Sequence, residues 1–353
     1  MKEELDLEAM RVNLQNWFES KLPRDSEIIL APLKRPGDGM NETFFIELQW
    51  RQGKKAKQEN LVIRWPPRDI SVFPKYHYDM KKQYMLLERL WDTAVPVPRV
   101  RWLEEDESVL GGPFYIMERV EGWVPGEFPP YHVAGQLFDA TGEEKARIWW
   151  NAVDTIANIH TLDWEKAGLN FLGVPRAGTD FMERQIAYYD EIYALNNEPM
   201  PPVLKATRGW LLKNSFEPKY ISLCWGDARL GNMIINEGEV VAVLDWELVF
   251  IGDPEADLGW FVHMDWATSV GRPDSPFPRL AGLPDMKETI AHYEKVTNRK
   301  VENLFYYEVF ATWRMAIFFT RMEQDARYIA RSKRAKGFIT MTHYEKLRNL
   351  LGL

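Results

Sequence analysis

The sequence predicts an α+β protein with two lobes, in which a small antiparallel β-sheet carrying one helix precedes a larger, mainly helical part. Two observations support this prediction. Residues 26–120 contain short apolar runs typical of strands, interrupted by one helical stretch. Beyond residue 122, apolar side chains recur every three or four positions. A chain of 353 residues is long enough to form one large domain or two ordinary ones.

The first lobe begins with three extended segments. They are SEIILAPL, TFFIELQW and NLVIRW, at residues 26–33, 43–50 and 60–65. Aromatic and β-branched residues favour strands in all three. The polar segment 51–60 is expected to connect the last two as a hairpin.

One helix is predicted next, over residues 79–91. Met80, Tyr84, Leu87 and Trp91 recur there at helical spacing, so we expect them on one face. Extended character returns at 95–106 and 111–120, where prolines disfavour a helix.

The second lobe is expected to be mainly helical, interrupted by two short strands around residues 227 and 245. Its first long helix is EEKARIWWNAVDTIANIH, whose predicted buried face is Trp149, Ala152, Val153, Ile156 and Ile159. The preceding segment EGWVPGEFPP is rich in Gly and Pro and is predicted to be a hinge. We therefore expect one lobe over residues 1–120 and another over 121–353.

Charge and composition exclude several classes of protein. With 44 Lys and Arg against 52 Asp and Glu, the net charge of −8 argues against a general binder of nucleic acid or anionic membranes. A single cysteine, Cys224, excludes intrachain disulfides and a cysteine-built zinc site. The longest run without Asp, Glu, Lys or Arg, residues 128–138, is shorter than the roughly 20 residues that span a membrane. No secretory signal is visible, so a cytoplasmic protein without membrane insertion is expected.

The chemistry is predicted to lie in LCWGDARLGNMIINEGEVVAVLDWE, residues 223–247. Asn232 follows Asp227 by five positions, and Asp245 comes thirteen residues later, directly after an apolar run. Phosphoryl transfer needs a carboxylate that orients the attacking hydroxyl and hard oxygen ligands for magnesium. A single Asp at a turn or strand end is ordinarily structural, so the prediction depends on the three residues together.

This arrangement resembles the catalytic loop and metal-binding Asp of the protein-kinase-like fold. The words GDARLGN, VLDWE and GDPEADLGWF are similar to those of the aminoglycoside phosphotransferase and choline kinase branch, including the kinase-like domains fused to acyl-CoA dehydrogenases. The resemblance implies ATP and Mg²⁺ as cofactors and a small hydroxyl-bearing molecule as substrate. It implies that Asp227 is the catalytic base, that Arg229 offsets charge on the transferred group, and that Asn232 and Asp245 bind the metal.

In the first lobe the resemblance implies a set of nucleotide contacts. These are a phosphate loop with Gly39, Asn41 and Thr43, a cationic Arg64 on a strand, and a purine-binding linker near Glu118 and Val120. Gln83 stands where an acidic partner of Arg64 is expected, and Glu88 lies five positions away, which is off the same helix face.

A second departure is Trp225, where most relatives have a histidine two residues before the base. An indole could hold the loop by packing and by its one N–H donor. His160 and Asp257 are expected to have structural roles, the latter by bonding loop backbone or capping a helix.

Three functional readings remain open. The first is a small-molecule kinase whose acceptor pocket lies in residues 122–219 and includes Arg184 and the tyrosines of RQIAYYDEIY. The second is a pseudokinase-like ligand-binding module, favoured by Gln83 and Trp225. The third is a kinase with a protein acceptor, disfavoured by the short span between Asp245 and Asp257.

Cationic acceptors would need acidic or aromatic pockets, whereas a hydroxyacyl thioester or other lipid-derived alcohol, slightly favoured by the resemblance, would need an apolar groove. The sequence gives no indication of oligomeric state.

Overall fold

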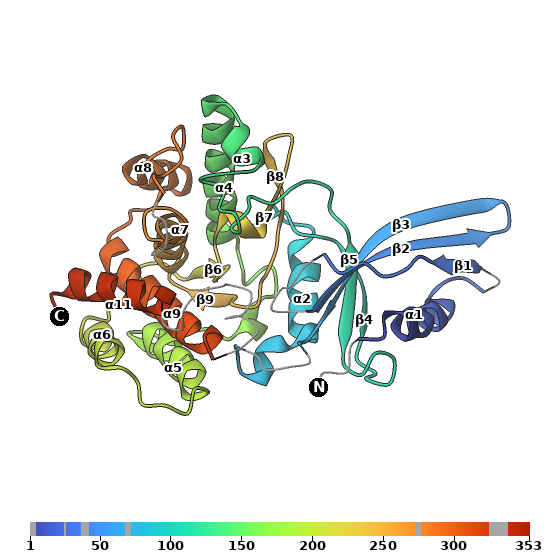
Figure 1. Cartoon of the computed structure of the whole chain (residues 1–353), viewed down its shortest axis with the longest axis horizontal. Coiled ribbons are helices and arrows are strands. Elements are labelled where there is room, and N and C mark those ends of the chain that lie inside the picture. The colour runs from blue at the N-terminus through green and yellow to red at the C-terminus, as the bar shows by residue number, and fades with distance from the viewer. Residues whose placement is uncertain (1–4, 25, 37–41, 68–71, 273–276, 325–337) are drawn as a thin grey trace. The chain divides into compact units, whose positions relative to one another are not determined.

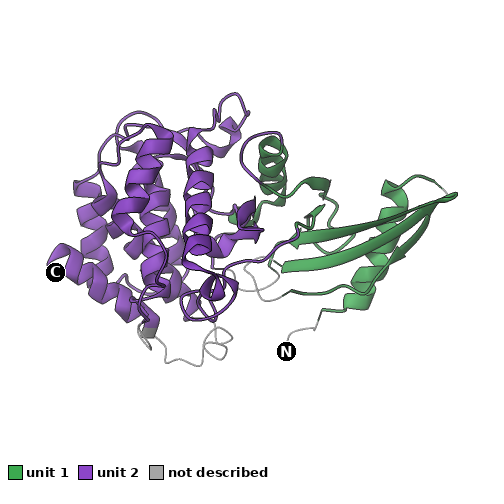
Figure 2. Ribbon diagram, turned by 90° about the horizontal axis from the view of Figure 1, so that it is seen from above, with its two compact units in different colours: residues 1–71, 75–91, 97–120 green, residues 72–74, 92–96, 121–353 purple. Residues whose placement is uncertain are grey.

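The computed structural model describes residues 5–24, 26–36, 42–67, 72–272, 277–324 and 338–353. The chain divides into two compact units, shown in different colours in Figure 2. The first consists of residues 1–71, 75–91 and 97–120, and the second of 72–74, 92–96 and 121–353. The units therefore differ from two continuous lobes, because two short segments group with the second unit. One reason is that the N–H of Val243 donates to the carbonyl of Pro96 at 2.8 Å.

The first unit is an antiparallel sheet with helices. Its elements are α1 (Leu7–Lys21), β1 (Glu27–Leu30), β2 (Glu42–Gln52), β3 (Lys55–Trp65), a 3₁₀ turn (Lys75–Tyr78), α2 (Met80–Leu90), β4 (Val100–Glu104) and β5 (Phe114–Glu118). The strand order is β1-β2-β3-β5-β4 (Figure 1). β2 and β3 stay paired out to Gln52 and Lys55, so the expected connection over 51–60 is mostly strand. Gly53, at φ +60°, makes this two-residue turn possible.

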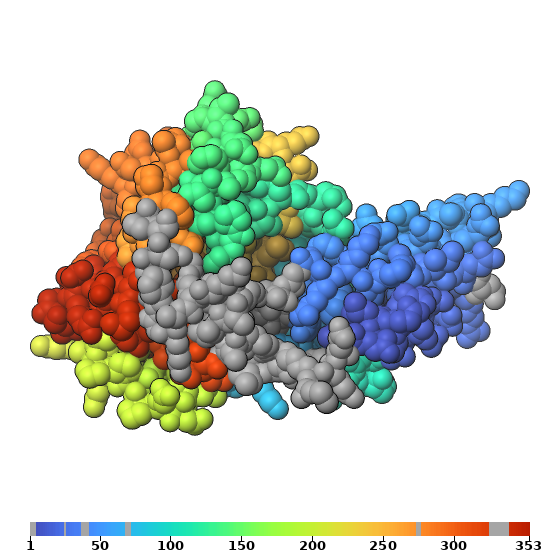
Figure 3. Space-filling model, viewed as in Figure 1, coloured from blue at the N-terminus to red at the C-terminus, as the bar shows by residue number. Residues whose placement is uncertain are grey.

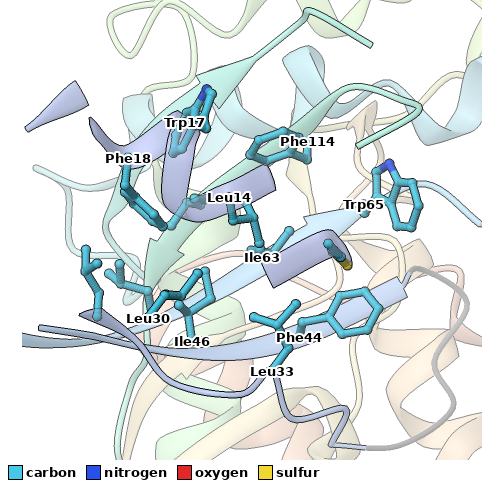
Figure 4. Close-up of a cluster of buried hydrophobic side chains, with 14 residues drawn as sticks. Leu14, Trp17, Phe18, Leu30, Leu33, Phe44, Ile46, Ile63, Trp65 and Phe114 are labelled. Carbon is cyan, nitrogen blue, oxygen red and sulfur yellow. The ribbon is translucent and has the colours of Figure 1, made fainter. Parts of the chain in front are cut away.

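A hydrophobic core lies between α1 and one face of this sheet (Figure 4). Alternate residues of β2 and β3 point to this face, because side chains of a strand alternate in direction. The core consists of Met10, Leu14, Trp17, Phe18, Leu30, Leu33, Phe44, Ile46, Leu48, Leu61, Ile63, Trp65, Phe114 and Ile116. The indole N–H of Trp17 donates to Glu104 at 2.7 Å, and this bond is the main cause that lowers the pKa of Glu104 to about 2.

The buried face of α2 differs from the expected one. Met80 and Leu87 are buried as predicted, but Tyr84 is half-buried and Trp91 is 44% exposed. Asp79 caps the helix by accepting from the N–H of Lys82. The face toward the rest of the unit carries a polar side chain, and it consists of Met80, Gln83, Leu86, Leu87 and Leu90. Apolar periodicity missed this face because a glutamine occupies its centre.

The second unit is mainly helical. Its helices are α3 (Gln136–Asp139), α4 (Gly142–Thr161), α5 (Asp180–Ala194), α6 (Pro202–Lys213), α7 (Glu255–Thr268), α8 (Met286–Thr297), α9 (Leu304–Met322) and α11 (Phe338–Leu351), with 3₁₀ turns at Asn170–Leu172 and Leu230–Asn232. Two small antiparallel pairs join β6 (Ser222–Cys224) to β9 (Phe250–Gly252) and β7 (Met233–Asn236) to β8 (Glu239–Val243).

Helix α9 is the centre of this unit and packs against α5, α6, α7 and α11. Figure 3 shows α11, in red, beside the yellow-green α5–α6 region. The predicted buried face of α4 is confirmed for all five of its residues. Cys224 is fully buried, as expected for a small apolar side chain. Within the described ranges, none of the helices has the length and apolar character needed to cross a bilayer.

Truncation of the first unit's core should be costly. Ile46 is 1% exposed, so Ile46→Ala should lower the free energy of unfolding by about 2–5 kcal/mol through lost burial and a cavity. Ile29, 62% exposed on the edge strand β1, is the matched control, and Ile29→Ala should change it by less than about 0.5 kcal/mol. Urea denaturation measures both, and equal losses would contradict the assigned core.

Two buried histidines should make the second unit sensitive to acid. Burial, helped by Lys346, lowers the pKa of His343 to about 4 and that of His263 well below its usual value. The unfolded chain therefore takes up these protons first, so stability should fall as pH drops from about 6.5 toward 4, by up to about 1.4 kcal/mol per pH unit for each residue. Denaturation of the His263→Phe/His343→Phe variant should show a shallower pH slope. A slope equal to that of the wild type would contradict this assignment.

Candidate active site

The loop between β6 and β7 carries Asp227, and both oxygens of this carboxylate accept hydrogen bonds. Oδ1 accepts from the indole N–H of Trp260 at 2.7 Å. Oδ2 accepts from Arg229 Nε at 3.0 Å and from Asn232 Nδ2 at 2.7 Å. Asn232, which is 2% exposed, also donates to the carbonyl of Asp227 at 3.2 Å. Because donors fix it from two sides, the Asp227 carboxylate is held in one orientation.

Arg229 links this carboxylate to a second acidic group. Its Nη1 donates to Oε1 of Glu127, a residue of the Gly- and Pro-rich segment that was predicted to be a hinge. Burial disfavours the guanidinium charge, but Asp227, Glu127 and Asp245 more than offset it and raise the pKa of Arg229 above its usual value. The cation is therefore permanently charged beside the predicted base. Glu127 was missed because nothing in its local sequence marks it.

Asn232 and Asp245 are brought together by a backbone bond. The N–H of Leu244 donates to the carbonyl of Asn232 at 2.9 Å, just where β8 ends. Asp245 follows with φ +56°, a left-handed conformation that is uncommon for residues other than glycine. Such conformations cost about 1–3 kcal/mol and cluster at functional sites. Asn232 uses its amide nitrogen on Asp227, which leaves its amide oxygen as the atom suited to a metal.

Trp225 holds the loop in the manner expected of an indole. Its N–H donates to the carbonyl of Leu244 at 2.8 Å, and its ring packs against Trp246 at 6.0 Å between centroids. The side chain is fully buried. Trp225 therefore connects the loop of Asp227 directly to the strand end of Asp245.

The motif GDPEADLGWF sets the position of this loop through several acidic side chains. Asp257 is fully buried and accepts from the N–H groups of Trp225 at 2.6 Å and Gly226 at 2.8 Å. His160 contacts the same carboxylate at 3.1 Å and Tyr293 at 2.8 Å through its other nitrogen. The structural roles expected for His160 and Asp257 are thus confirmed.

Two further acids of the motif organise α7 and α9. Asp253 accepts from the hydroxyl of Tyr307 at 2.8 Å and from the N–H of Glu255, and burial raises its pKa to about 7. Glu255 accepts from the N–H groups of Glu302 and Asn303 at 2.9 and 2.7 Å, at the start of α9. A Cβ on Gly259 would lie 2.6 Å from that of Tyr307, so this glycine permits the close approach of α7 and α9.

A small pocket opens beside Arg229. Its cavity volume is about 10 Å³, room for about one water molecule. It is lined by Glu127, Tyr131, Arg229, Leu230, Gly231, Phe261, Met264, Asp265 and Thr268. Asp265 is 7% exposed and is bound by Arg279 Nε at 2.6 Å and the hydroxyl of Tyr131 at 3.2 Å. The pocket lining is thus mixed, with polar and apolar side chains in similar measure, and its acidic groups are already bound by donors.

The segment RQIAYYDEIY does not line this pocket, contrary to expectation. Tyr189 and Tyr193 are buried in the helical core. Arg184 Nε pairs instead with Asp180 at 2.6 Å, within the same helix. Tyr189 and Tyr193 therefore serve packing, and the pocket residues come from residues 127–131, from residues 229–231 and from α7.

In the first unit, Arg64 is held by Thr43. The two residues are cross-strand neighbours, and Arg64 Nη1 donates to Thr43 Oγ1 at 2.9 Å. Gln83 is buried and accepts from the hydroxyl of Tyr115, a weak bond at 3.4 Å, while Glu88 is exposed. Tyr115 is the cross-strand neighbour of Arg64 in the sheet.

The remaining expected nucleotide contacts are only partly placed. Gly39 and Asn41 lie outside the described residues. Glu118 ends β5, with its N–H bonded to the carbonyl of Arg99 at 2.8 Å and its carboxylate to Arg101 at 3.1 Å. Val120 is half-buried, at the end of the first unit.

One cluster of His, Cys and Asp side chains has metal-like spacing. The ligand atoms of His160, Cys224 and Asp257 lie within 4.8 Å of one another. Asp257 is already engaged by two backbone N–H groups, and burial raises the pKa of the Cys224 thiol well above its usual value. The cluster is thus a hydrogen-bonded support of the loop.

The backbone before Asp227 should tolerate glycine alone. Gly226 has φ +86°, and a Cβ there would lie 2.0 Å from the carbonyl oxygen of Leu248. Gly226→Ala should therefore lower the free energy of unfolding by at least about 2 kcal/mol. Gly209 lies in α6 with open space around it, so the control Gly209→Ala should raise that free energy by about 0.5–1 kcal/mol. Thermal unfolding measures both, and a neutral Gly226→Ala would refute this geometry.

Comparison with known proteins agrees with this arrangement. The sequence profile of the Phosphotransferase enzyme family, APH, matches residues 43–289. Acyl-CoA dehydrogenase family member 11 of Mus musculus is 27% identical over 290 residues, which are 80% of this chain and 35% of that protein. The chain thus spans about a third of that relative's length.

Solved structures share the fold. One, from Ralstonia eutropha JMP134 and provisionally described as an aminoglycoside phosphotransferase, has a TM-score of 0.69 and 25% identity, covering 96% of this chain and 98% of that one. Aminoglycoside phosphotransferase APH(4)-Ia, in a ternary complex with AMP-PNP and hygromycin B, has a TM-score of 0.56 and 14% identity, covering 97% and 100%. The predicted α+β, protein-kinase-like fold and family resemblance are confirmed. The chain belongs to the phosphotransferase enzyme family.

Proposed function

We propose that this protein transfers the γ-phosphoryl group of ATP, with Mg²⁺, to a hydroxyl of a small molecule. The observation that carries the proposal is the joint placement of three groups. Asp227, Asn232 and Asp245 lie on one connected set of loop and strand ends, linked by the bonds of Asn232 to Asp227 and of Leu244 to Asn232. Phosphoryl transfer depends mainly on such positioning and on electrostatic stabilisation.

The proposed role of Asp227 is to orient the acceptor hydroxyl. In the transfer, the acceptor oxygen forms a bond to the γ-phosphorus while the bond to the β-phosphate oxygen breaks, and ADP leaves. The hydroxyl proton passes to the Asp227 carboxylate or to water. Arg229, fixed between Asp227 and Glu127, would place a permanent positive charge near the transferred group.

The donors present fit a magnesium ion. The amide oxygen of Asn232 and the carboxylate of Asp245 are hard oxygen ligands, and Mg²⁺ keeps several waters, so two protein ligands suffice. When bound, the ion would neutralise phosphate charge. Asp245 is held for this role by its unusual backbone conformation and by the support of Trp225 beneath Leu244.

The first unit is proposed to supply nucleotide contacts. Arg64 and Thr43 present a guanidinium and a hydroxyl on adjacent strands, suited to phosphate oxygens. Backbone of Glu118 and Val120 would bind the purine edge, and Gly39 and Asn41 complete the proposed set. A structural relative that binds AMP-PNP supports the choice of nucleotide.

The pocket beside Arg229 is proposed to hold the hydroxyl-bearing part of the acceptor. Its walls include Tyr131, Phe261 and Met264, and the acids among its lining residues are matched by Arg229 and Arg279. Phe128, adjacent to Glu127, is 75% exposed. These features favour a hydroxyl beside an uncharged, partly apolar segment, such as a lipid-derived alcohol, over a strongly anionic group.

Pools of hydroxylated metabolites, scored by Mg-dependent release of ADP from ATP, test this function. Asp227→Asn should lower turnover by about 10²–10⁴ while leaving nucleotide affinity nearly unchanged, because the base acts in the transfer step. Asp139→Asn, at an exposed site ending α3, is the control and should retain full turnover. If the wild type binds nucleotide but releases no ADP with any acceptor, and Asp227→Asn behaves in the same way, the pseudokinase-like module is favoured instead.

A further inference from the structure

We propose that Trp260 and Arg314 form a pair that positions the Asp227 carboxylate for phosphoryl transfer. This inference rests on the proposed function for its catalytic meaning. The apolar sequence patterns around these two residues would predict only a packing role in the helical core. Both are positioning residues, since neither is proposed to contact the substrate.

Trp260 is the donor to the oxygen of Asp227 that the loop itself leaves unbound. Within the loop, Arg229 and Asn232 both donate to Oδ2. The indole N–H of Trp260 reaches Oδ1 from α7 at 2.7 Å. Two opposed anchors fix the rotation of the carboxylate plane, which one-sided bonds would leave free. A hydrogen bond to an ionised carboxylate is also about twice as strong as a neutral one.

The indole is itself held by a buried cation. The guanidinium of Arg314, on α9, lies 4.1 Å from the Trp260 ring centroid. On its other sides it lies near Tyr189 at 5.1 Å and Phe310 at 5.5 Å. His263 stacks on Trp260 at 6.1 Å with an interplanar angle of 29°. The indole, 2% exposed, therefore has little freedom to swing away from Asp227.

Arg314 also contacts the catalytic loop directly. Its Nη2 donates to the carbonyl of Gly226 at 2.7 Å, one peptide before Asp227. Thus one guanidinium fixes the backbone next to the base and the ring that bonds the side chain of the base. Arg314 from α9 and Trp260 from α7 thus hold Gly226 and Asp227, two neighbouring residues of the loop.

The environment of Arg314 is unusual for a charged side chain. It is 1% exposed, and among the described residues its Nε and Nη1 have no hydrogen-bond partner and it forms no ion pair. Burying a charge without a carboxylate partner is costly, even when aromatic faces offset part of the loss. An apolar residue would fill a core position at lower cost. Packing alone does not explain an arginine at this position, whereas its contacts with Gly226 and Trp260 do.

The contact can be tested by NMR of protein with ¹⁵N-labelled indoles, without any phosphoryl transfer. Trp260→Phe should remove one indole signal and so assign it. In Asp227→Asn that signal should move upfield, because the indole loses a charged acceptor, and in Arg314→Lys it should also shift. Trp313, fully buried with its N–H on the Leu204 carbonyl at 3.1 Å, is the matched control. Its signal, assigned with Trp313→Phe, should stay in place in Asp227→Asn. An unmoved Trp260 signal would overturn the contact.

The catalytic consequence is tested by kinetics with MgATP and an acceptor found by the metabolite screen, or water if hydrolysis is measurable. Trp260→Phe should lower kcat by about 10- to 100-fold, with KM for ATP changed less than twofold, because the orientation of the base changes and nucleotide binding does not.

Trp313→Phe loses a similar buried indole bond and should keep kcat within about twofold. If Trp260→Phe retains wild-type kcat while the NMR contact is present, the positioning role is refuted. If the wild type transfers no phosphoryl group at all, the proposed function fails, and with it the catalytic meaning of a contact that the NMR result establishes separately.

Discussion

The site depends on one buried carboxylate, that of Asp257. It accepts the N–H groups of Trp225 and Gly226 and is itself contacted by His160, so it fixes the backbone immediately before Asp227. Unsatisfied buried N–H groups would cost about 1–3 kcal/mol each, which makes this acceptor hard to replace. The left-handed turn at Gly226 follows from that attachment, and the loop geometry follows from the turn.

The decapeptide GDPEADLGWF makes several structural contacts at once. Its three acids bind the start of α7, the start of α9 and the loop of Asp227, and its tryptophan bonds Asp227. This dense use of one segment explains how a short, irregular loop can hold charged groups in a fixed orientation. Helices supply the support, and the loop carries the side chains for which catalytic roles are proposed.

Much of this could be predicted from the sequence, and the exceptions have physical causes. The strands, the buried face of α4 and the D-x-x-x-x-N loop are encoded by local sequence patterns, so the sequence predicts them. The face of α2 was misassigned because Gln83 is buried by a contact with Tyr115, distant in sequence. Glu127, Trp260 and Arg314 reach the loop through long-range contacts that no local spacing encodes. Tyr189 and Tyr193 were predicted to line a pocket but are buried in the core, because a sequence pattern does not distinguish core aromatic residues from pocket ones.

The attachment of α9 to α7 has an evolutionary implication. Glu255 accepts from the N–H groups of Glu302 and Asn303, and Tyr307 bonds Asp253, so the start of α9 is fixed by the same short motif that begins α7. The stretch between α7 and α9 has its own contacts with the site, because Tyr293 bonds His160 at 2.8 Å and Arg279 bonds Asp265 at 2.6 Å. An insertion that leaves both contacts in place adds little closure entropy. Insertions there are a low-risk route by which relatives could diversify what they recognise.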